Sequence, residues 1–304
     1  MTDKLILAVA LLTSLTWGLT GIFIRLLPSV SPMLIASSRL FIAFVVALPV
    51  LLFWQKRQPA IALAYKTPRA YLLAALLVAY YWLATTAFQL APVAEVALLL
   101  STPPLFVLAL RKLAGHKPTL LELCGALVAL TGMLIILLPK LFAPAVWTLQ
   151  QVSGDLAALA AAVMTALYAF FYKTLADQAK APHAIGVSAL TFAIGAMLLA
   201  LCATNETSVK QFALLSQRDV YLFIGLGVIS TALPTLGFAL ASKRLPAVVT
   251  ASISLFIPLF AGVFGVLILQ EPLTPGFLFG AVLVISGVIM MIRHTTRSAG
   301  TRPV

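Results

Sequence analysis

Hydroxyl-bearing and aromatic side chains stand in the middle of several long apolar segments, where a membrane-spanning helix would place them near the centre of a bilayer. Together they could hydrogen-bond a small polar solute and stack against its apolar part. Tyr and Trp normally gather at the two membrane interfaces instead. The cluster therefore predicts a solvated substrate cavity, the alternative being core packing in which each hydroxyl bonds a nearby carbonyl. The predicted binding residues are Ser14, Trp17, Tyr80, Tyr81, Trp82, Thr102, Thr165, Tyr168, Thr231 and Phe256.

Two charged residues, Arg39 and Glu95, fall inside apolar segments at similar depths. A charge is costly in lipid, so each needs a partner or water. One interpretation is a structural Arg39–Glu95 pair or snorkelling of the side chains. The other is an outer gate, with Arg39 as a handle for a substrate carboxylate.

Prolines interrupt three of the apolar segments. A proline inside a helix removes a backbone hydrogen bond and clashes with the preceding turn. We expect either hinges or static bends at these positions. The prolines are Pro103, Pro104, Pro234 and Pro258.

The composition excludes a water-soluble fold. Of 304 residues, 62% are hydrophobic and 9% charged, and the mean hydropathy is +1.10, whereas soluble domains carry about 25% charged residues. Cys124 and Cys202 lie in apolar runs without a CxxC motif, so no metal site, disulfide or cofactor is predicted. The apolar segments hold no paired acids and no Ser and His arrangement, which argues against an intramembrane enzyme.

Runs of about 20 apolar residues are long enough to cross a bilayer as helices. The chain contains ten such runs, so an all-α integral membrane protein with ten transmembrane helices is predicted. The runs lie near 5–25, 33–54, 70–90, 93–112, 119–138, 153–173, 184–203, 219–241, 247–269 and 276–293.

The Lys and Arg residues of the short loops predict the orientation, because such loops stay on the cytoplasmic side. With the N-terminus inside, fifteen of the 20 basic residues fall on the inner side and four on the outer side, Arg39 being the twentieth. We therefore expect both termini in the cytoplasm. The charge of +12 is accounted for by topology, and no nucleic-acid partner is expected.

The chain repeats itself after 154 residues: Pro92, Pro104 and Phe106 correspond to Pro246, Pro258 and Phe260. Because each repeat would hold five helices, an odd number, the second must enter the membrane from the opposite side, as an inverted repeat. The predicted repeats are 1–146 and 147–304.

Glycines at seven-residue intervals occur in the last segment of each repeat. Such spacing places the glycines on one face, where small residues permit close helix contact. Segments 119–138 and 276–293 are therefore predicted to pack together, away from the cavity. The glycines are Gly125, Gly132, Gly280 and Gly287.

This plan resembles the drug/metabolite transporter superfamily, specifically its EamA-like branch. The matching positions are Trp17-Gly18, Ser38-Arg39-Leu40, the stretches 97–106 and 251–260, Gln270-Glu271-Pro272-Leu273-Thr274, and the small-residue segments that end each repeat. The resemblance implies a carrier of small metabolites that works by alternating access. The small multidrug exporters of the superfamily exchange a proton at a first-helix glutamate, and segment 5–24 here has no acid.

We therefore expect a secondary transporter for small polar or aromatic metabolites, amino acids above all, working as an exporter. The alternative is a transporter that imports or exchanges an organic cation or another metabolite. A protein of a different functional class, a non-transporting membrane sensor or assembly subunit, is the other hypothesis. The expected location is a bacterial-type inner (plasma) membrane. The expected partners are a small-molecule substrate and the lipid bilayer, with the protein a monomer or a weak homodimer.

Overall fold

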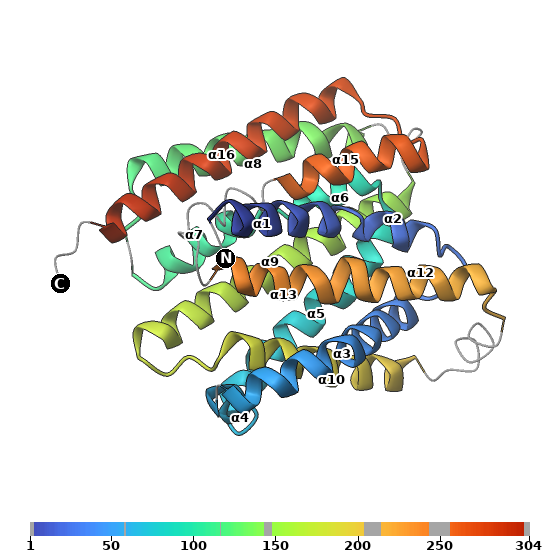
Figure 1. The fold of residues 1–304 in the computed structure, drawn as a ribbon. Helices are drawn as coiled ribbons and strands as arrows, with labels where there is room; N and C mark the ends of the chain where they lie inside the picture. The colour runs from blue at the N-terminus through green and yellow to red at the C-terminus, as the bar shows by residue number, and fades with distance from the viewer. Residues whose placement is uncertain are drawn as a thin grey trace.

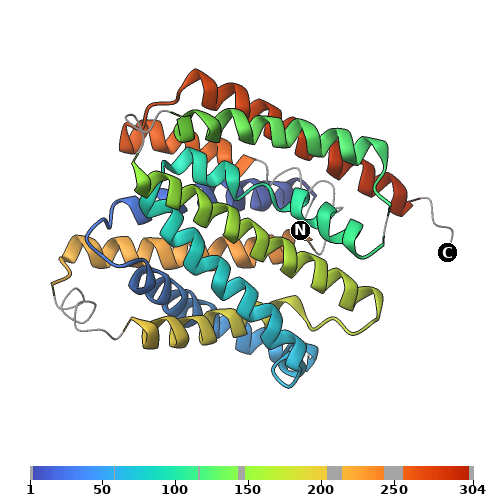
Figure 2. The same cartoon turned by 180° about the vertical axis from the view of Figure 1, so that it is seen from behind.

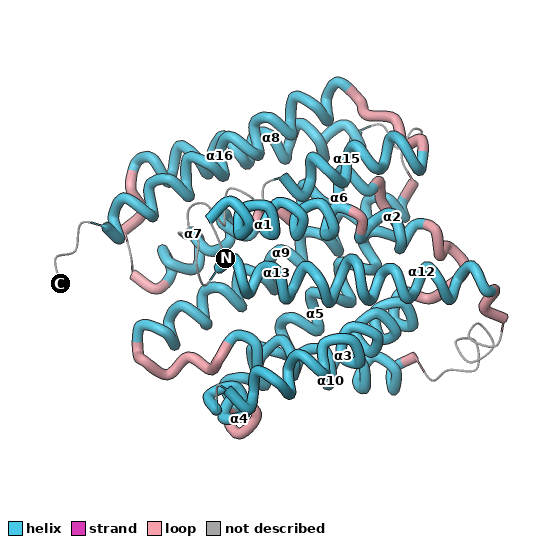
Figure 3. The backbone as a smooth tube through the Cα atoms, in the orientation of Figure 1, coloured by secondary structure: helices cyan, strands magenta, loops and turns pink. Residues whose placement is uncertain are grey.

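The computed structural model describes residues 3–57, 59–115, 117–142, 148–203, 214–242 and 256–300, and all regular structure in these ranges is helical. The helices form one bundle in which most axes run in similar directions (Figure 1, Figure 3). Long apolar sequences with helix-compatible residues satisfy every backbone group internally only as helices in a membrane. An all-helical fold is thus confirmed.

The helices of the first half follow the predicted segments. They are α1 (Asp3–Gly18), α2 (Thr20–Arg25), α3 (Pro32–Arg57), α4 (Pro59–Ala64), α5 (Pro68–Leu90), α6 (Val93–Leu99), α7 (Pro103–Leu113) and α8 (Leu120–Phe142). The short helix α4 lies between the long helices α3 and α5.

The helices of the second half also lie within or around the predicted segments. They are α9 (Leu149–Asp177), α10 (Ala184–Cys202), α12 (Gln217–Gly227), the π-helix η1 (Val228–Ala232), α13 (Leu233–Ser242), α15 (Phe256–Leu269) and α16 (Pro275–Gly300). The part of the 247–269 segment before Phe256 lies outside the described residues.

Six helical stretches in the described part of the chain are long and apolar enough to cross a membrane: Pro32–Pro49, Pro68–Leu90, Val93–Leu113, Leu149–Asp177, Ala184–Cys202 and Gln217–Gly237. Three shorter apolar helices accompany them, Leu120–Ile136, Phe256–Leu269 and Pro275–Met290.

The 93–112 segment is broken rather than bent. Helix α6 ends at Leu99 and α7 begins at Pro103. Pro103 has no N–H to donate to the carbonyl four residues back, that of Leu99. The Leu99 carbonyl accepts instead from the backbone N–H of Thr102 at 3.1 Å and from its hydroxyl at 2.6 Å. Thr102, which is fully buried, therefore satisfies the carbonyl that the helix break exposes.

The 219–241 segment carries the π-helix η1 just before Pro234. A π-turn inserts one residue into a helix and occurs often at functional sites. The Leu233 N–H donates to the Val228 carbonyl within this turn, whereas Pro234 has no N–H to donate to the Ser230 carbonyl four residues back.

Helices α8 and α16 pack against each other along their length at one edge of the bundle, as Figures 1 and 2 show from opposite sides. A Cβ atom at Gly132 would lie 2.6 Å from the Gly280 carbonyl oxygen. The backbones can come this close only because residue 132 is a glycine. The predicted packing of the two glycine-bearing segments is confirmed.

The remaining helices pair across the two halves. Helix α3 packs along α10, α5 along α9, α1 along α13, and α6 along α15. The two halves therefore pack against each other through several pairs of helices.

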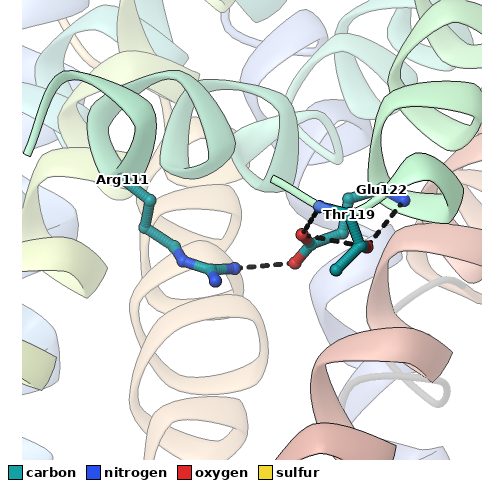
Figure 4. Close-up of polar contacts among 3 residues, drawn as sticks. All are labelled: Arg111, Thr119 and Glu122. Carbon is teal, nitrogen blue, oxygen red and sulfur yellow. Dashed lines mark hydrogen bonds and ion pairs between the residues drawn. The ribbon is translucent and has the colours of Figure 1, made fainter. Parts of the chain in front are cut away.

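A capping box lies at the start of α8, and its Glu122 also binds Arg111 of α7 (Figure 4). The Thr119 N–H donates to Glu122 Oε2 at 2.9 Å, and the Glu122 N–H donates to Thr119 Oγ1 at 3.4 Å. This reciprocal pair satisfies two backbone donors at the start of α8. Arg111 near the end of α7 donates to Glu122 Oε1 at 2.8 Å. The Glu122 carboxylate, 2% exposed, therefore closes the turn.

Candidate functional site

A cavity of about 160 Å³ lies at the centre of the bundle, between α1, α2, α3, α5, α6 and α15. It combines a guanidinium group with hydroxyls and aromatic rings on an otherwise apolar wall. Its lining residues are Trp17, Thr20, Arg39, Tyr80, Tyr81, Ala84, Phe88, Ala97, Leu100, Ser101, Ile257 and Ala261. A few polar groups in an apolar pocket are typical of a small-molecule site.

A close helix contact places Trp17 at the cavity. A Cβ atom at the neighbouring Gly18 would lie 2.8 Å from the Cβ of Phe260, so α1 can approach α15 this closely only with a glycine there. The same contact involves Ile257 and Ala261, one turn apart on α15, and both belong to the lining of the cavity.

Arg39 is the one basic residue among the described residues that line this cavity, and it is 2% exposed. Its Nε–H donates to Thr231 Oγ1 at 3.1 Å, and its Nη2 donates to the Ser230 carbonyl at 3.5 Å. The guanidinium carbon also lies 5.0 Å from the centre of the Tyr81 ring, within the range of a cation–π contact.

The partners of Arg39 thus differ from the Glu95 pairing that the sequence suggested. Helix α6 presents Ala97 to the cavity, and Glu95 stands two residues earlier, about 200° around the helix. Position along a segment predicts the depth of a residue in the membrane but not the side of the helix on which it lies. For this reason the sequence suggested a pair that the described residues do not form.

Of the predicted binding residues, the structure brings Trp17, Tyr80 and Tyr81 together in the lining. Thr231 is fully buried and touches the site through Arg39. Trp82 is 38% exposed and lies outside the lining, because one residue along a helix turns the side chain by about 100°.

The other predicted residues stand outside this lining. The Tyr168 ring stacks on Tyr172 with centroids 5.7 Å apart, and the Thr165 hydroxyl donates to the Ala161 carbonyl at 3.1 Å. Ser14 is buried in α1, and Phe256 is 42% exposed at the start of α15. The Thr102 hydroxyl is bonded to the Leu99 carbonyl at the helix break described above.

The four prolines take different places. Pro103 and Pro104 open α7, whereas Pro234 lies inside α13 and Pro258 inside α15. Pro234 and Pro258 are both buried. Their role as hinges stays a prediction.

Several lining residues escaped the sequence-based selection, notably Thr20, Phe88 and Ile257. Their spacing in the sequence relates two of them to residues that were predicted. Tyr80, Ala84 and Phe88 recur every four residues on α5, and Thr20 follows Trp17 by three, which places each set on one helix face. Apolar members of such a face were indistinguishable from lipid-facing residues in the sequence.

A larger cavity of about 650 Å³ lies between α3, α10 and α12. Its wall is apolar except for the hydroxyls of Ser37 and Ser38, so it offers a polar metabolite little to bind. Within the described ranges, no group of three or more His, Cys, Asp or Glu side chains is arranged to hold a metal ion.

Comparison with known proteins adds the following findings. The sequence model of the EamA-like transporter family matches the chain twice, over residues 4–138 and 152–293. Curated proteins gave no match. A solved structure described as "Crystal structure of protein" superposes with a TM-score of 0.63 over 97% of this chain and 100% of that chain, at 19% sequence identity, a likeness that concerns the fold alone.

Proposed function

Because the chain belongs to the EamA-like transporter family, whose members are membrane transporters of small metabolites and not enzymes, we propose that it exports small polar or aromatic metabolites, amino acids above all. The observation that carries this proposal is the central cavity, which Trp17, Tyr80 and Tyr81 line together with the buried Arg39. Rings supply stacking surfaces and the hydroxyls supply hydrogen bonds.

We further propose alternating access by ten transmembrane helices in two inverted five-helix repeats. The pairing of helices supports this arrangement. Counterparts in the two halves pack on each other in α3 with α10, α6 with α15 and α8 with α16, and the α5–α9 contact is matched by the α13–α1 contact. A two-fold relation between the halves would generate this set of contacts.

The proposed location is a bacterial-type inner membrane, with both termini in the cytoplasm, as the distribution of Lys and Arg favours. The outward direction of transport rests on the family resemblance. Cells that express the protein should release a loaded substrate faster than cells without it. Faster accumulation would instead favour import.

The decisive test of transport is counterflow in proteoliposomes with labelled amino acids and organic cations. Trp17→Ala and Tyr81→Ala should each weaken substrate binding by roughly 1 to 3 kcal/mol, the range for burying a large apolar group. Trp82→Ala is the matched control, because it removes an aromatic ring from the same helix as Tyr81 but outside the cavity. Equal losses in all three variants, or no counterflow in the parent, would contradict the proposal.

A further inference from the structure

Arg39 carries a buried positive charge whose contacts are all neutral in the part of the chain that the structure describes. They are the Thr231 hydroxyl, the Ser230 carbonyl and the Tyr81 ring. Burial of a charge is costly unless a countercharge or several hydrogen bonds offset it. This guanidinium therefore favours the arrival of an anion.

Four acidic residues in the described part of the chain are engaged away from Arg39. Of the eight in the sequence, Glu122 pairs with Arg111, Asp177 with Lys173 and Glu271 with Arg25. Asp219 caps α12 through Ser216. Among the described residues that line the cavity, none is acidic.

The π-helix and Pro234 explain how Arg39 is held. In an α-helix the carbonyl of Ser230 would accept from the N–H of residue 234, which a proline lacks. The carbonyl accepts from Arg39 Nη2 instead. The Thr231 hydroxyl accepts from Arg39 Nε and donates to the Leu226 carbonyl at 2.8 Å, which orients its oxygen toward the guanidinium.

These contacts occupy one edge of the guanidinium. Arginine has five N–H donors, and the two bonds to Thr231 and Ser230 leave three of them without a partner among the described residues. Because Arg39 lines the cavity, a ligand bound there that can accept two parallel hydrogen bonds would satisfy donors that the protein leaves open. A carboxylate has that geometry.

We propose that Arg39 is the carboxylate subsite of the cavity, held by the π-helix, and that the protein selects substrates that carry a carboxylate. Trp17, Tyr80 and Phe88 form the apolar wall of the same cavity and would contact the body of such a substrate. This assignment rests on the proposed function and adds to it the charge class of the substrate.

The test uses three probes that share one aromatic body: phenylalanine, 3-phenylpropionate, which lacks the amino group, and phenethylamine, which lacks the carboxylate. Their binding to the purified full-length protein in detergent is measured by calorimetry. We expect both carboxylates to bind at least about tenfold more tightly than the amine, since a hydrogen bond between charged groups is worth that much. An amine that binds as tightly as the acids, or no carboxylate binding, overturns the assignment.

Variants identify the group responsible. Arg39→Gln should abolish the preference for the acids, while Arg39→Lys should retain part of it. Thr231→Val, which keeps the shape of the side chain and removes the acceptor for Nε, should lower affinity for the acids several-fold and leave the amine unchanged. The Thr231→Val variant tests the same assignment if Arg39→Gln fails to fold. An unchanged preference in Thr231→Val together with Arg39→Gln or Arg39→Lys would overturn the role of Arg39. If the carboxylate assignment fails in this way, counterflow of a neutral or cationic substrate by the parent protein would still support the proposed transport function.

Discussion

The Nε atom of Arg25 on α2 lies 3.5 Å from Oε1 of Glu271, which stands between α15 and α16. An ion pair therefore joins the first half of the chain to the second. The other carboxylate oxygen of Glu271 accepts from the Val93 N–H at 2.8 Å, at the first residue of α6. Arg25 in turn donates to the Gln89 carbonyl at 2.7 Å. The Glu271 carboxylate thus contacts α2 and the start of α6 directly, and it is linked to the end of α5 through Arg25.

Removing the Glu271 carboxylate should destabilise the protein mainly through Val93. Its N–H is fully buried, and an unsatisfied buried donor costs about 1 to 3 kcal/mol. Glu271→Ala should therefore lower the melting temperature in detergent more than Glu271→Gln, whose amide oxygen can still accept. The partly exposed Arg25 adds little to either effect. Equal melting temperatures for the two variants would refute the role given to Val93.

Glu271 should also make stability depend on pH. Burial raises the pKa of its carboxyl above 4.5, and the Val93 amide and Arg25 oppose this shift without cancelling it. The folded protein then binds more protons than the unfolded chain above pH 4.5, so the stability contributed by this group is lost as the pH rises through the folded pKa. From about pH 4 to about pH 7, the parent should lose melting temperature relative to Glu271→Gln, and a constant difference would contradict the prediction.

Gly132 tests the contact between α8 and α16. Alanine there would force a Cβ to within 2.6 Å of the Gly280 carbonyl oxygen, and overpacking costs about 1 to 3 kcal/mol. Gly276→Ala is the control, because nothing lies within 4 Å of its added Cβ. Thermal unfolding in detergent should show a loss for Gly132→Ala alone. If both variants melt like the parent, the helices do not pack this closely.

Tyr168 should affect folding rather than binding. Its ring stacks on Tyr172 beside a cluster that includes Leu73 and Ala74, and it is not in the cavity lining. Tyr168→Ala should lower the melting temperature and leave the affinity for substrate within twofold of the parent, roughly the scatter of such measurements. Tyr81→Ala provides the contrast, with an affinity loss. A variant of Tyr168 that folds well but binds weakly would return this ring to the site.

The proposed topology is testable with single cysteines in a background that replaces Cys124 and Cys202, both of which are exposed. Cysteines at positions 58 and 114 should react only with reagents that reach the cytoplasm, and one at 206 only from outside. Positions 58 and 206 lie outside the described residues. The reverse labelling pattern would require the opposite orientation.

Patterns of apolar length and small residues determined much of the architecture. The predicted segments correspond to helices because a run of about 20 apolar residues has one stable form in a bilayer. The glycines of α8 and α16 likewise predicted their contact, since residues spaced by seven share a helix face. The sequence also predicted that Trp17, Tyr80 and Tyr81 contribute to a cavity, because aromatic residues usually lie at the membrane interfaces and not at that depth.

Tertiary structure alone decided which of the midplane side chains meet. The rotation of a helix about its axis is set by packing against its neighbours, so Tyr81 faces the cavity while Trp82, one residue later, faces outward. The partner of Arg39 was likewise beyond the sequence. Thr231 is 192 residues away in the chain. Its hydroxyl meets the guanidinium because α3 packs against the π-helix η1, and contacts between segments so far apart in the chain are not specified by residue types.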